Sequence, residues 1–274
     1  MKKEIQKSKG ELKRSFGKKL NLSNLNLITL EDLTSELVLP RTFYQLVIFM
    51  LDGSNSMNGR TDDGRSKAVR IEDSIKSILS RLKKSKNKES FDLSFIIFSD
   101  DYTDVFDDGI KRLVDIDTQQ CFNPIKLIQE PKDTRLANAL KYAKDRSNQY
   151  IKENSDRTTQ VLLLILSDGA LDDYSDSLKE VNELKMNPQI TVACQYLEKY
   201  IDEDSKWYSC DEATGELDYD SPWTIEEVRA SEERRSNKFK RFASSDELFI
   251  TTMDPALVRD HMIKSITLIS KTNL

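Results

Sequence analysis

Three oxygen-bearing side chains alternate directly after an apolar stretch of the sequence. They are Asp52, Ser54 and Ser56, and the stretch before them is 46–51. A second apolar stretch of six residues is followed by Ser167 and then by another carboxylate, Asp168. In an open parallel sheet, ligands bind outside the carboxyl ends of the strands, so these groups are expected at one edge of a sheet.

A third hydroxyl, that of Thr134, stands at the start of a helical pattern. Two carboxylates and three hydroxyls form an all-oxygen set, which suits a hard divalent cation such as Mg²⁺. An open coordination position on such a cation would favour an anionic oxygen. The simplest source of that oxygen is an Asp or Glu of a partner protein.

The elements that must position these side chains follow from hydrophobic periodicity. Continuous apolar runs predict strands buried on both faces, and apolar stripes at a spacing of three or four residues predict helices. Strands are expected at 46–51, 93–98, 161–166, 190–196 and 248–252, and helices near 66–84, from 136, near 175–186 and from Asp254-Pro255. Alternating strands and helices predict an α/β domain with a doubly wound, mostly parallel sheet and helices on both faces.

The domain is expected to span 43–274 and to contain an insertion at 198–245, because nearly fifty positions separate two consecutive core strands there. The insertion is predicted to form a hairpin followed by a helix that starts near Ser221-Pro222. Residues 1–42 are predicted to be a basic arm and a leucine-rich extension, since the first 20 residues hold eight Lys or Arg and two Glu.

The five polar residues occur in an order that resembles a known family. The sequence pattern Asp-x-Ser-x-Ser, then Thr, then Asp is the metal-ion-dependent adhesion site of the von Willebrand factor A domain. The resemblance covers about 43–197 and resumes at 246–270. It implies a Rossmann-like fold and an intracellular protein of the bacterial type. By this resemblance, Ser54, Ser56 and Thr134 would touch Mg²⁺, or Mn²⁺ or Ca²⁺ in its place, whereas Asp52 and Asp168 would act largely through waters.

Two positions depart from the usual pattern of that family. Asn55 stands where a glycine separates the two serines, and Asp133 replaces the glycine before Thr134. Asn tolerates left-handed backbone conformations, so the first change is mild. The charge of Asp133 could strengthen cation binding or weaken the binding of an acidic partner.

The insertion carries aromatic side chains among many charges, which is typical of protein interfaces. Segment 198–220 holds nine Asp or Glu and two Lys. Two interpretations are open: the aromatic residues contact a partner, or they pack onto the domain as a cover. The residues concerned are Trp207, Tyr208, Tyr219 and Trp223.

Composition limits the remaining classes. The chain has 274 residues, a net charge of −5 and no apolar run long enough to span a membrane, so neither a membrane nor a nucleic acid is an expected partner. It also lacks a secretory signal pattern, which favours the cytoplasm. The three cysteines are expected to be free thiols. The single histidine, His261, has no second ligand near it and is not expected to bind metal.

The function that fits these features best is a metal-dependent protein-interaction module without catalytic activity. The resemblance implies an adaptor in a complex with a kinase, a phosphatase or an AAA+ ATPase. One alternative is a hydrolase or phosphotransferase that uses Asp52 as nucleophile, although position 54 is Ser where that chemistry needs a second acid. Another alternative is a structural subunit with a vestigial metal site.

Overall fold

A computed structural model of the protein describes residues 43–271, apart from 129–132, 205 and 211–216. These residues belong to one compact unit, Arg41–Leu274. The predicted basic arm and leucine-rich extension at 1–42 lie outside the described residues.

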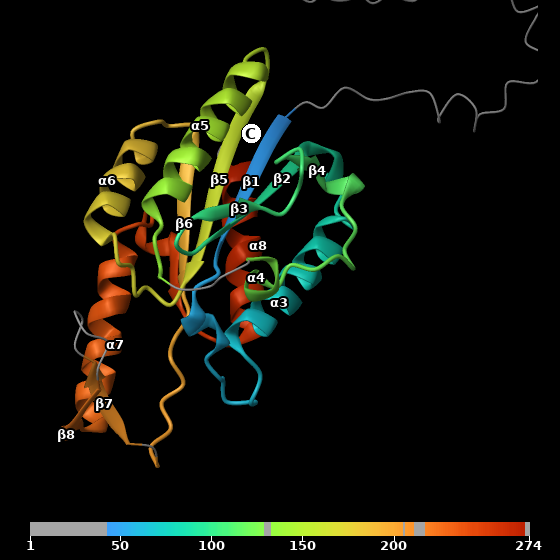
Figure 1. The fold of residues 1–274 in the computed structure, drawn as a ribbon. Coiled ribbons are helices and arrows are strands. Elements are labelled where there is room, and N and C mark those ends of the chain that lie inside the picture. The colour runs from blue at the N-terminus through green and yellow to red at the C-terminus, as the bar shows by residue number, and fades with distance from the viewer. Residues whose placement is uncertain (1–42, 129–132, 205, 211–216, 272–274) are drawn as a thin grey trace, which may run out of the picture. The chain divides into compact units, whose positions relative to one another are not determined.

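A seven-stranded sheet forms the centre of this unit (Figure 1). Its main path has the order β3-β2-β1-β5-β6-β9, and β4 pairs with β2 beside that path. Strands β2, β1, β5, β6 and β9 are parallel, whereas β3 and β4 run antiparallel to β2. The strands are β1 Phe43–Asp52, β2 Phe91–Phe98, β3 Tyr102–Asp104, β4 Lys111–Arg112, β5 Thr158–Ser167, β6 Ile190–Tyr196 and β9 Phe249–Thr251.

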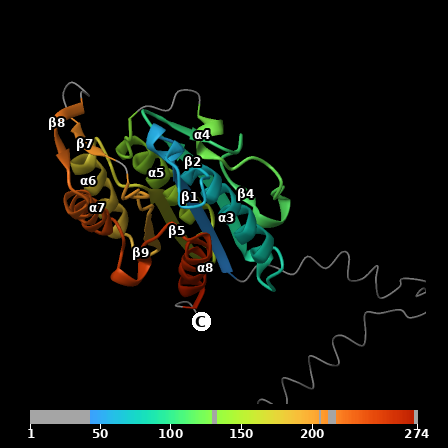
Figure 2. The same ribbon diagram turned by 90° about the horizontal axis from the view of Figure 1, so that it is seen from below.

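Helices cover both faces of the sheet, as Figure 2 shows from the second direction. Helix α3 packs against α8 on one face, and α5 packs against α6 on the other. The described helices are α3 Lys67–Leu82, α4 Pro124–Leu127, α5 Ala137–Glu153, α6 Tyr174–Lys185, α7 Ile225–Lys240 and α8 Pro255–Lys271, with short 3₁₀ turns at η2 Asn55–Asn58, η3 Lys88–Ser90, η4 Leu113–Asp115 and η5 Asp246–Leu248. The doubly wound, mostly parallel α/β fold predicted from the sequence is confirmed.

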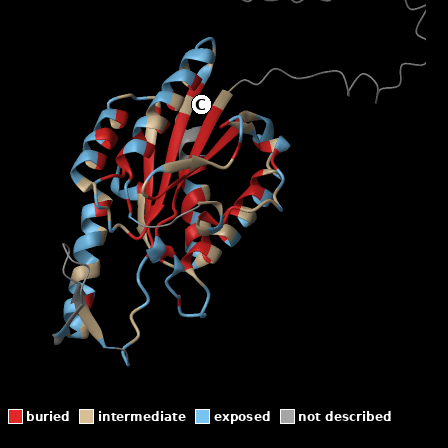
Figure 3. Ribbon diagram, in the orientation of Figure 1, coloured by how far each residue is buried: buried red, intermediate tan, exposed pale blue. Residues whose placement is uncertain are grey.

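The core consists of the apolar strands and the inner stripes of the helices (Figure 3). Residues 46–51 of β1 are fully buried because helices cover both faces of this central strand. Between β1 and β2, the rings of Phe49 and Phe95 stack with their centroids 4.6 Å apart. Leu51 pairs with Ile97 on one side and with Leu166 on the other. This register aligns the carboxyl ends of the three strands, where the predicted site lies.

The segment between β6 and β9 contains the predicted hairpin and helix. Strands β7 (Trp207–Cys210) and β8 (Leu217–Trp223) form a separate two-stranded sheet. Strand β8 extends through the predicted helix start, so α7 begins at Ile225, after a capping box formed by Thr224 and Glu227. Helix α7 lies in the connection from β6 to β9. Its buried Phe239 packs against the ring of Tyr196 at the end of β6.

Antiparallel strands β3 and β4 are additions to the predicted set of elements. Both strands pair with β2, and the turns around Asp100 and Asp108 lie beside them. In the part of the chain that the structure describes, no helix has both the length and the apolar character needed to cross a lipid bilayer.

Candidate metal centre

The end of β1 holds Asp52 and two hydroxyls in a compact, hydrogen-bonded turn. The backbone N–H of Ser54 donates to Asp52 Oδ1 at 2.8 Å, and the hydroxyls of Ser54 and Ser56 lie 2.9 Å apart. Asp52 and Ser54 are buried, whereas Ser56 is exposed at the start of the 3₁₀ turn η2. The sequence folds in this way because Gly53 approaches the end of β2, where its N–H donates to Phe98 O and an added Cβ would meet Ile97 Cγ2 at 2.7 Å.

The neighbouring strand β5 supplies the second carboxylate. Ser167, its last residue, donates from Oγ to Asp52 Oδ2 at 2.6 Å and accepts from the N–H of Gly169 at 3.0 Å. Asp168 between them is 8% exposed. Gly169 has a φ of +74°, and a Cβ at that position would lie 2.6 Å from the Tyr196 ring, so only glycine fits the turn after Asp168.

The two carboxylates interact electrostatically. Burial, reinforced by the negative charge of Asp168, raises the pKa of Asp52 to about 7, and the hydrogen bonds from Ser167 and Ser54 oppose this shift. Oδ1 of Asp168 is buried and has no hydrogen-bond partner among the described residues. Two adjacent buried carboxylates therefore form a site that favours a positive charge.

A positive charge from the protein already lies beside this pair. Lys67, the first residue of α3, donates from Nζ to Asp168 Oδ2 and to the backbone carbonyl of Leu197, each at 3.2 Å. Lys67 is not among the site residues predicted from the sequence. A signal was nevertheless present, because a lysine in the first turn of a helix faces the positive end of the helix dipole.

Thr134 lies on the loop before α5, and Asp172 and Asp173 after β5 hold that loop in place. Asp172 Oδ2 accepts from the N–H of Thr134 at 2.7 Å, and the N–H of Asp172 donates back to Thr134 O at 3.0 Å. Asp173 accepts from the N–H groups of Leu136 and Ala137 at 3.0 and 2.8 Å. The two acids thus fix Thr134 relative to the β5 edge, a role that was not predicted from the sequence.

Asp133, next to Thr134, is exposed and its charge is paired. Its carboxylate lies 3.1 Å from Arg135 Nη2, and its backbone N–H donates to Asp100 Oδ1. Its backbone carbonyl accepts from Ser99 Oγ at the end of β2. The loop is therefore tied to the β2 edge as well.

A cleft of about 680 Å³ opens above the centre, and we call it the metal-site cleft. Ser56, Lys67 and Asp168 line one part of it, and residues after β6 line the facing part, including Lys199 and Trp207. The loop 59–64 also borders the cleft. The further lining residues are Asn55, Ala170, Tyr200, Asp202, Glu232 and Arg235.

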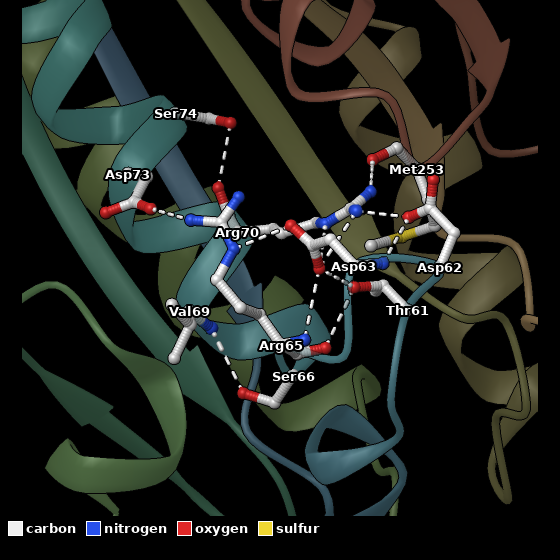
Figure 4. A network of polar contacts seen from close by, with 10 residues as sticks. All are labelled: Thr61, Asp62, Asp63, Arg65, Ser66, Val69, Arg70, Asp73, Ser74 and Met253. Carbon is white, nitrogen blue, oxygen red and sulfur yellow. Dashed lines mark hydrogen bonds and ion pairs between the residues drawn. The ribbon is translucent and has the colours of Figure 1, made fainter.

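A polar network fixes the loop beside the cleft (Figure 4). Arg70 on α3 is 6% exposed, and its guanidinium reaches both Asp62 and Asp63 of the loop. It also donates to Met253 O, which lies between β9 and α8, at 2.8 Å. The exposed Arg65 pairs with Asp63 at 2.7 Å. The network joins the loop to the following helix α3 and to the distant segment between β9 and α8.

A second cavity of about 880 Å³ adjoins the metal-site cleft and shares Thr61, Asp62, Lys199, Tyr200 and Glu232 with it. We call it the α7 cavity, because residues 229–236 of α7 and residues 251–255 form much of its lining.

The four aromatic residues predicted to contact a partner have different surroundings. Trp207 lines the metal-site cleft, lies under the Lys199 ammonium at 4.3 Å and donates from its indole nitrogen to Asp202 O. Tyr208 and Tyr219 pack ring to ring at 5.0 Å, and Tyr219 is 67% exposed. Trp223 pairs with Trp207 across the hairpin. Their role in partner binding stays a prediction.

The residues at the end of β1 and β5 fit a divalent cation by donor chemistry. The hydroxyls of Ser54 and Ser56 are neutral oxygens, and Asp168 Oδ1 is an unpaired, buried anionic oxygen. Among the described residues there is no group of three or more His, Cys, Asp or Glu side chains that could hold a metal. A cation here would thus depend on the serine and threonine hydroxyls.

The sequence pattern that defines the von Willebrand factor type A domain matches residues 47–204 of the chain. The chain belongs to this family. None of the curated proteins compared with it matches its sequence.

Solved structures share the fold of this von Willebrand factor type A domain. The pilus adhesin SpaC of Lactobacillus rhamnosus GG, in an open conformation, matches with a TM-score of 0.58 at 12% identity, over 84% of this chain and 30% of the adhesin. Proximal thread matrix protein 1 from the mussel byssus was solved with zinc in its metal-ion-dependent adhesion site (MIDAS) motif. It matches with a TM-score of 0.51 at 15% identity, over 84% of this chain and 47% of the mussel protein. The chain thus spans less than half of either protein.

Proposed function

We propose that this von Willebrand factor type A domain is a metal-dependent protein-interaction module. Ser54, Ser56 and Thr134 would contact a divalent cation, and Asp52 and Asp168 would neutralise it, largely through waters. The cation would supply an electrophilic position for a carboxylate of a partner protein. The chain would then serve as an adaptor subunit in a larger complex.

The observation that carries this proposal is the buried, unpaired Oδ1 of Asp168, a residue that lines the metal-site cleft. A buried anionic oxygen without a hydrogen-bond donor is costly unless a ligand compensates it. The hydroxyls of Ser54 and Ser56 point to the same kind of ligand, since they lie together and one of them is accessible in the cleft. The cleft also leaves room for a side chain of a partner.

The comparisons support the same function. The mussel byssus protein of the same fold carries zinc at a MIDAS motif, and the SpaC protein is an adhesin. Oxygen donors without thiolate or imidazole favour Mg²⁺ as the cation here, with Mn²⁺ or Ca²⁺ as substitutes.

Catalysis by Asp52 is disfavoured by its contacts. Both of its carboxylate oxygens already accept hydrogen bonds, one from Ser54 N and one from Ser167 Oγ, and the residue is fully buried. A nucleophile needs an accessible oxygen beside the reacting atom.

The partner would be a cytoplasmic protein with an exposed Asp or Glu, in a complex with a kinase, a phosphatase or an AAA+ ATPase.

The proposal is tested by calorimetric titration of Mg²⁺ into the wild-type protein and into a Ser54→Ala/Ser56→Ala variant. We expect saturable one-site binding to the wild type and at least about tenfold weaker binding to the double variant, because two ligands are lost. Asn55→Ala is the matched control, since Asn55 lies between the serines and its side chain bonds Asn58. The control is expected to retain wild-type affinity.

Capture of proteins from the native lysate then tests the interaction itself. A partner that binds in Mg²⁺, is lost in EDTA and is not retained by the double variant would support a metal-bridged contact. A partner retained in EDTA and by the variant would contradict it and would support the structural-subunit alternative. Absence of Mg²⁺ and Mn²⁺ binding by the wild type would contradict the metal site.

A further inference from the structure

Lys67 occupies an unusual position for a lysine. It is 3% exposed, although lysine side chains are rarely buried without a partner. It is also the first residue of α3, whose first turn contains no acidic residue. The positive end of the helix dipole therefore disfavours its charge, and a contact elsewhere must compensate.

That contact is with the candidate metal centre. The ammonium lies 3.2 Å from Asp168 Oδ2 in an ion pair whose side chains are 4% and 10% exposed. The carbonyl of Leu197, just after β6, accepts a second hydrogen bond at the same distance. Lys67 thus bridges the edges of β5 and β6.

Two positive groups would compete for one carboxylate if a divalent cation entered. Oδ2 of Asp168 accepts a hydrogen bond from the Lys67 ammonium, and Oδ1 has no partner among the described residues. A cation on the second oxygen would lie close to the ammonium, and the two charges would repel strongly in a buried site.

We propose that Lys67 is an internal countercharge that occupies Asp168 when metal is absent and that a divalent cation must displace. Its ammonium offsets the repulsion between the carboxylates of Asp52 and Asp168 in the metal-free protein, and it lowers the affinity of the site for metal. The site consequently responds to the metal concentration instead of retaining a cation permanently. This inference rests on the proposed function and adds to it a means of regulation.

The test compares the wild type with Lys67→Met, which retains the aliphatic stem without the charge. Mn²⁺ affinity is measured by electron paramagnetic resonance and Mg²⁺ affinity by calorimetry. We expect Lys67→Met to bind either ion at least about tenfold more tightly. Lys76→Met is the matched control, because Lys76 lies on the same helix and pairs with Glu72 at 2.8 Å. It is expected to leave the affinity unchanged.

Thermal unfolding in EDTA gives a second readout that does not depend on metal. Lys67→Met leaves Asp168 buried without a countercharge, so its unfolding temperature is expected to fall by several degrees. The added substitution Asp168→Asn should restore most of that loss. If Lys67→Met does not fold in EDTA, refolding in Mg²⁺ should recover it, whereas Lys67→Met/Asp168→Asn should fold without metal.

The outcomes separate this inference from the proposed function. Equal or weaker metal binding by Lys67→Met, with binding by the wild type intact, would overturn the inference and leave the metal-dependent module in place. Absence of binding by both proteins would overturn the two together. An unchanged unfolding temperature in EDTA would show that Asp168 needs no countercharge from Lys67.

Discussion

Single buried polar groups set much of the chemistry of this domain, and they differ in how they are compensated. Asp52 has a hydrogen-bond donor on each carboxylate oxygen, whereas Asp168 has a donor on one oxygen only. Asp52 is therefore suited to orient the turn after β1. Asp168 is suited to face a ligand, because it retains an oxygen that the described residues do not satisfy.

His261 is a buried titratable residue outside the candidate metal centre. Burial, together with the nearby charge of Lys264, lowers its pKa from 6.5 to about 4, against a hydrogen bond to the backbone of Cys194. Its Nε2 has no partner in the described part of the chain, so protonation would bury an unpaired N–H. The histidine is therefore neutral in the folded protein near pH 7.

This lowered pKa predicts a pH dependence of stability. His261 binds a proton near pH 6.5 in the unfolded chain and near pH 4 in the folded chain. Its contribution to the free energy of unfolding is therefore fully present above pH 6.5 and is lost as the pH falls toward 4. The loss attributable to His261 is expected to reach about 3 kcal/mol.

Urea denaturation of the wild type and of His261→Leu between pH 7.5 and 4 measures this effect. The difference in unfolding free energy between the two proteins should shift in favour of the variant as the pH falls. A constant difference across this range would show that His261 does not titrate differently in the two states.

At the scale of elements, the N-terminus of α5 connects stability to the site. Its N-cap residue, Leu136, provides no side-chain hydrogen bond, and Asp173 from the loop after β5 accepts from the first two backbone N–H groups instead. In contrast, Thr224 caps α7 locally. The two caps stabilise similar helices, but only the first lies beside Thr134.

We therefore expect Asp173→Ala and Thr224→Ala each to lower the unfolding free energy by about 1 kcal/mol. Only Asp173→Ala should also weaken Mg²⁺ binding, because Thr134 would lose its fixed position. Chemical denaturation and calorimetry on both variants test this. Equal Mg²⁺ affinities in the two variants would contradict a positioning role for Asp173.

Elements of the central sheet were predictable because their periodicity is local. The apolar runs ending at Leu51 and Leu166 identify buried strands without any knowledge of their partners. Strand β3 was not predictable, since Tyr102–Asp104 carries no apolar pattern and forms only by pairing with β2. The start of α7 was placed too early, because Pro222 belongs to the hairpin and Thr224 provides the cap.

Site prediction had the same limit. The order of Asp52, Ser54 and Ser56 after a strand is visible in the sequence, as is the strand before Asp168. The roles of Lys67 and Asp173 depend on contacts over 101 and 36 residues, respectively, which no spacing rule specifies. Their positions follow from the strand order of the folded sheet.

At the scale of the whole unit, Arg70 joins three parts of the chain. From α3 its guanidinium contacts Asp62 and Asp63 of the loop and the carbonyl of Met253 before α8 (Figure 4). The side chain of Arg70 is 7% exposed, whereas that of Arg65 in the same network is 47% exposed. The guanidinium of Arg70 is thus largely removed from water, and it depends on its protein partners more than the guanidinium of Arg65 does.

Arg70→Met is expected to lower the unfolding free energy by about 1–3 kcal/mol, because the part-buried Met253 carbonyl loses its charged donor. Arg65→Met should have a much smaller effect, since the guanidinium of Arg65 is itself accessible to water. Denaturation of both variants at low and high salt checks the prediction. A similar loss in both would show that burial does not distinguish the two arginines.

Strand β9 adds three residues to the sheet, and among the described residues it pairs only with 194–196 of β6. In contrast, β1 has neighbours on both sides along nearly its whole length. Amide protons of β1 should therefore exchange with solvent only when the entire unit opens, but those of β9 should exchange during local fraying. The α7 cavity has residues 251–255 in its wall, and the metal centre lies at the end of β1. The α7 cavity and the metal-site cleft would then open on different timescales, although they share five lining residues.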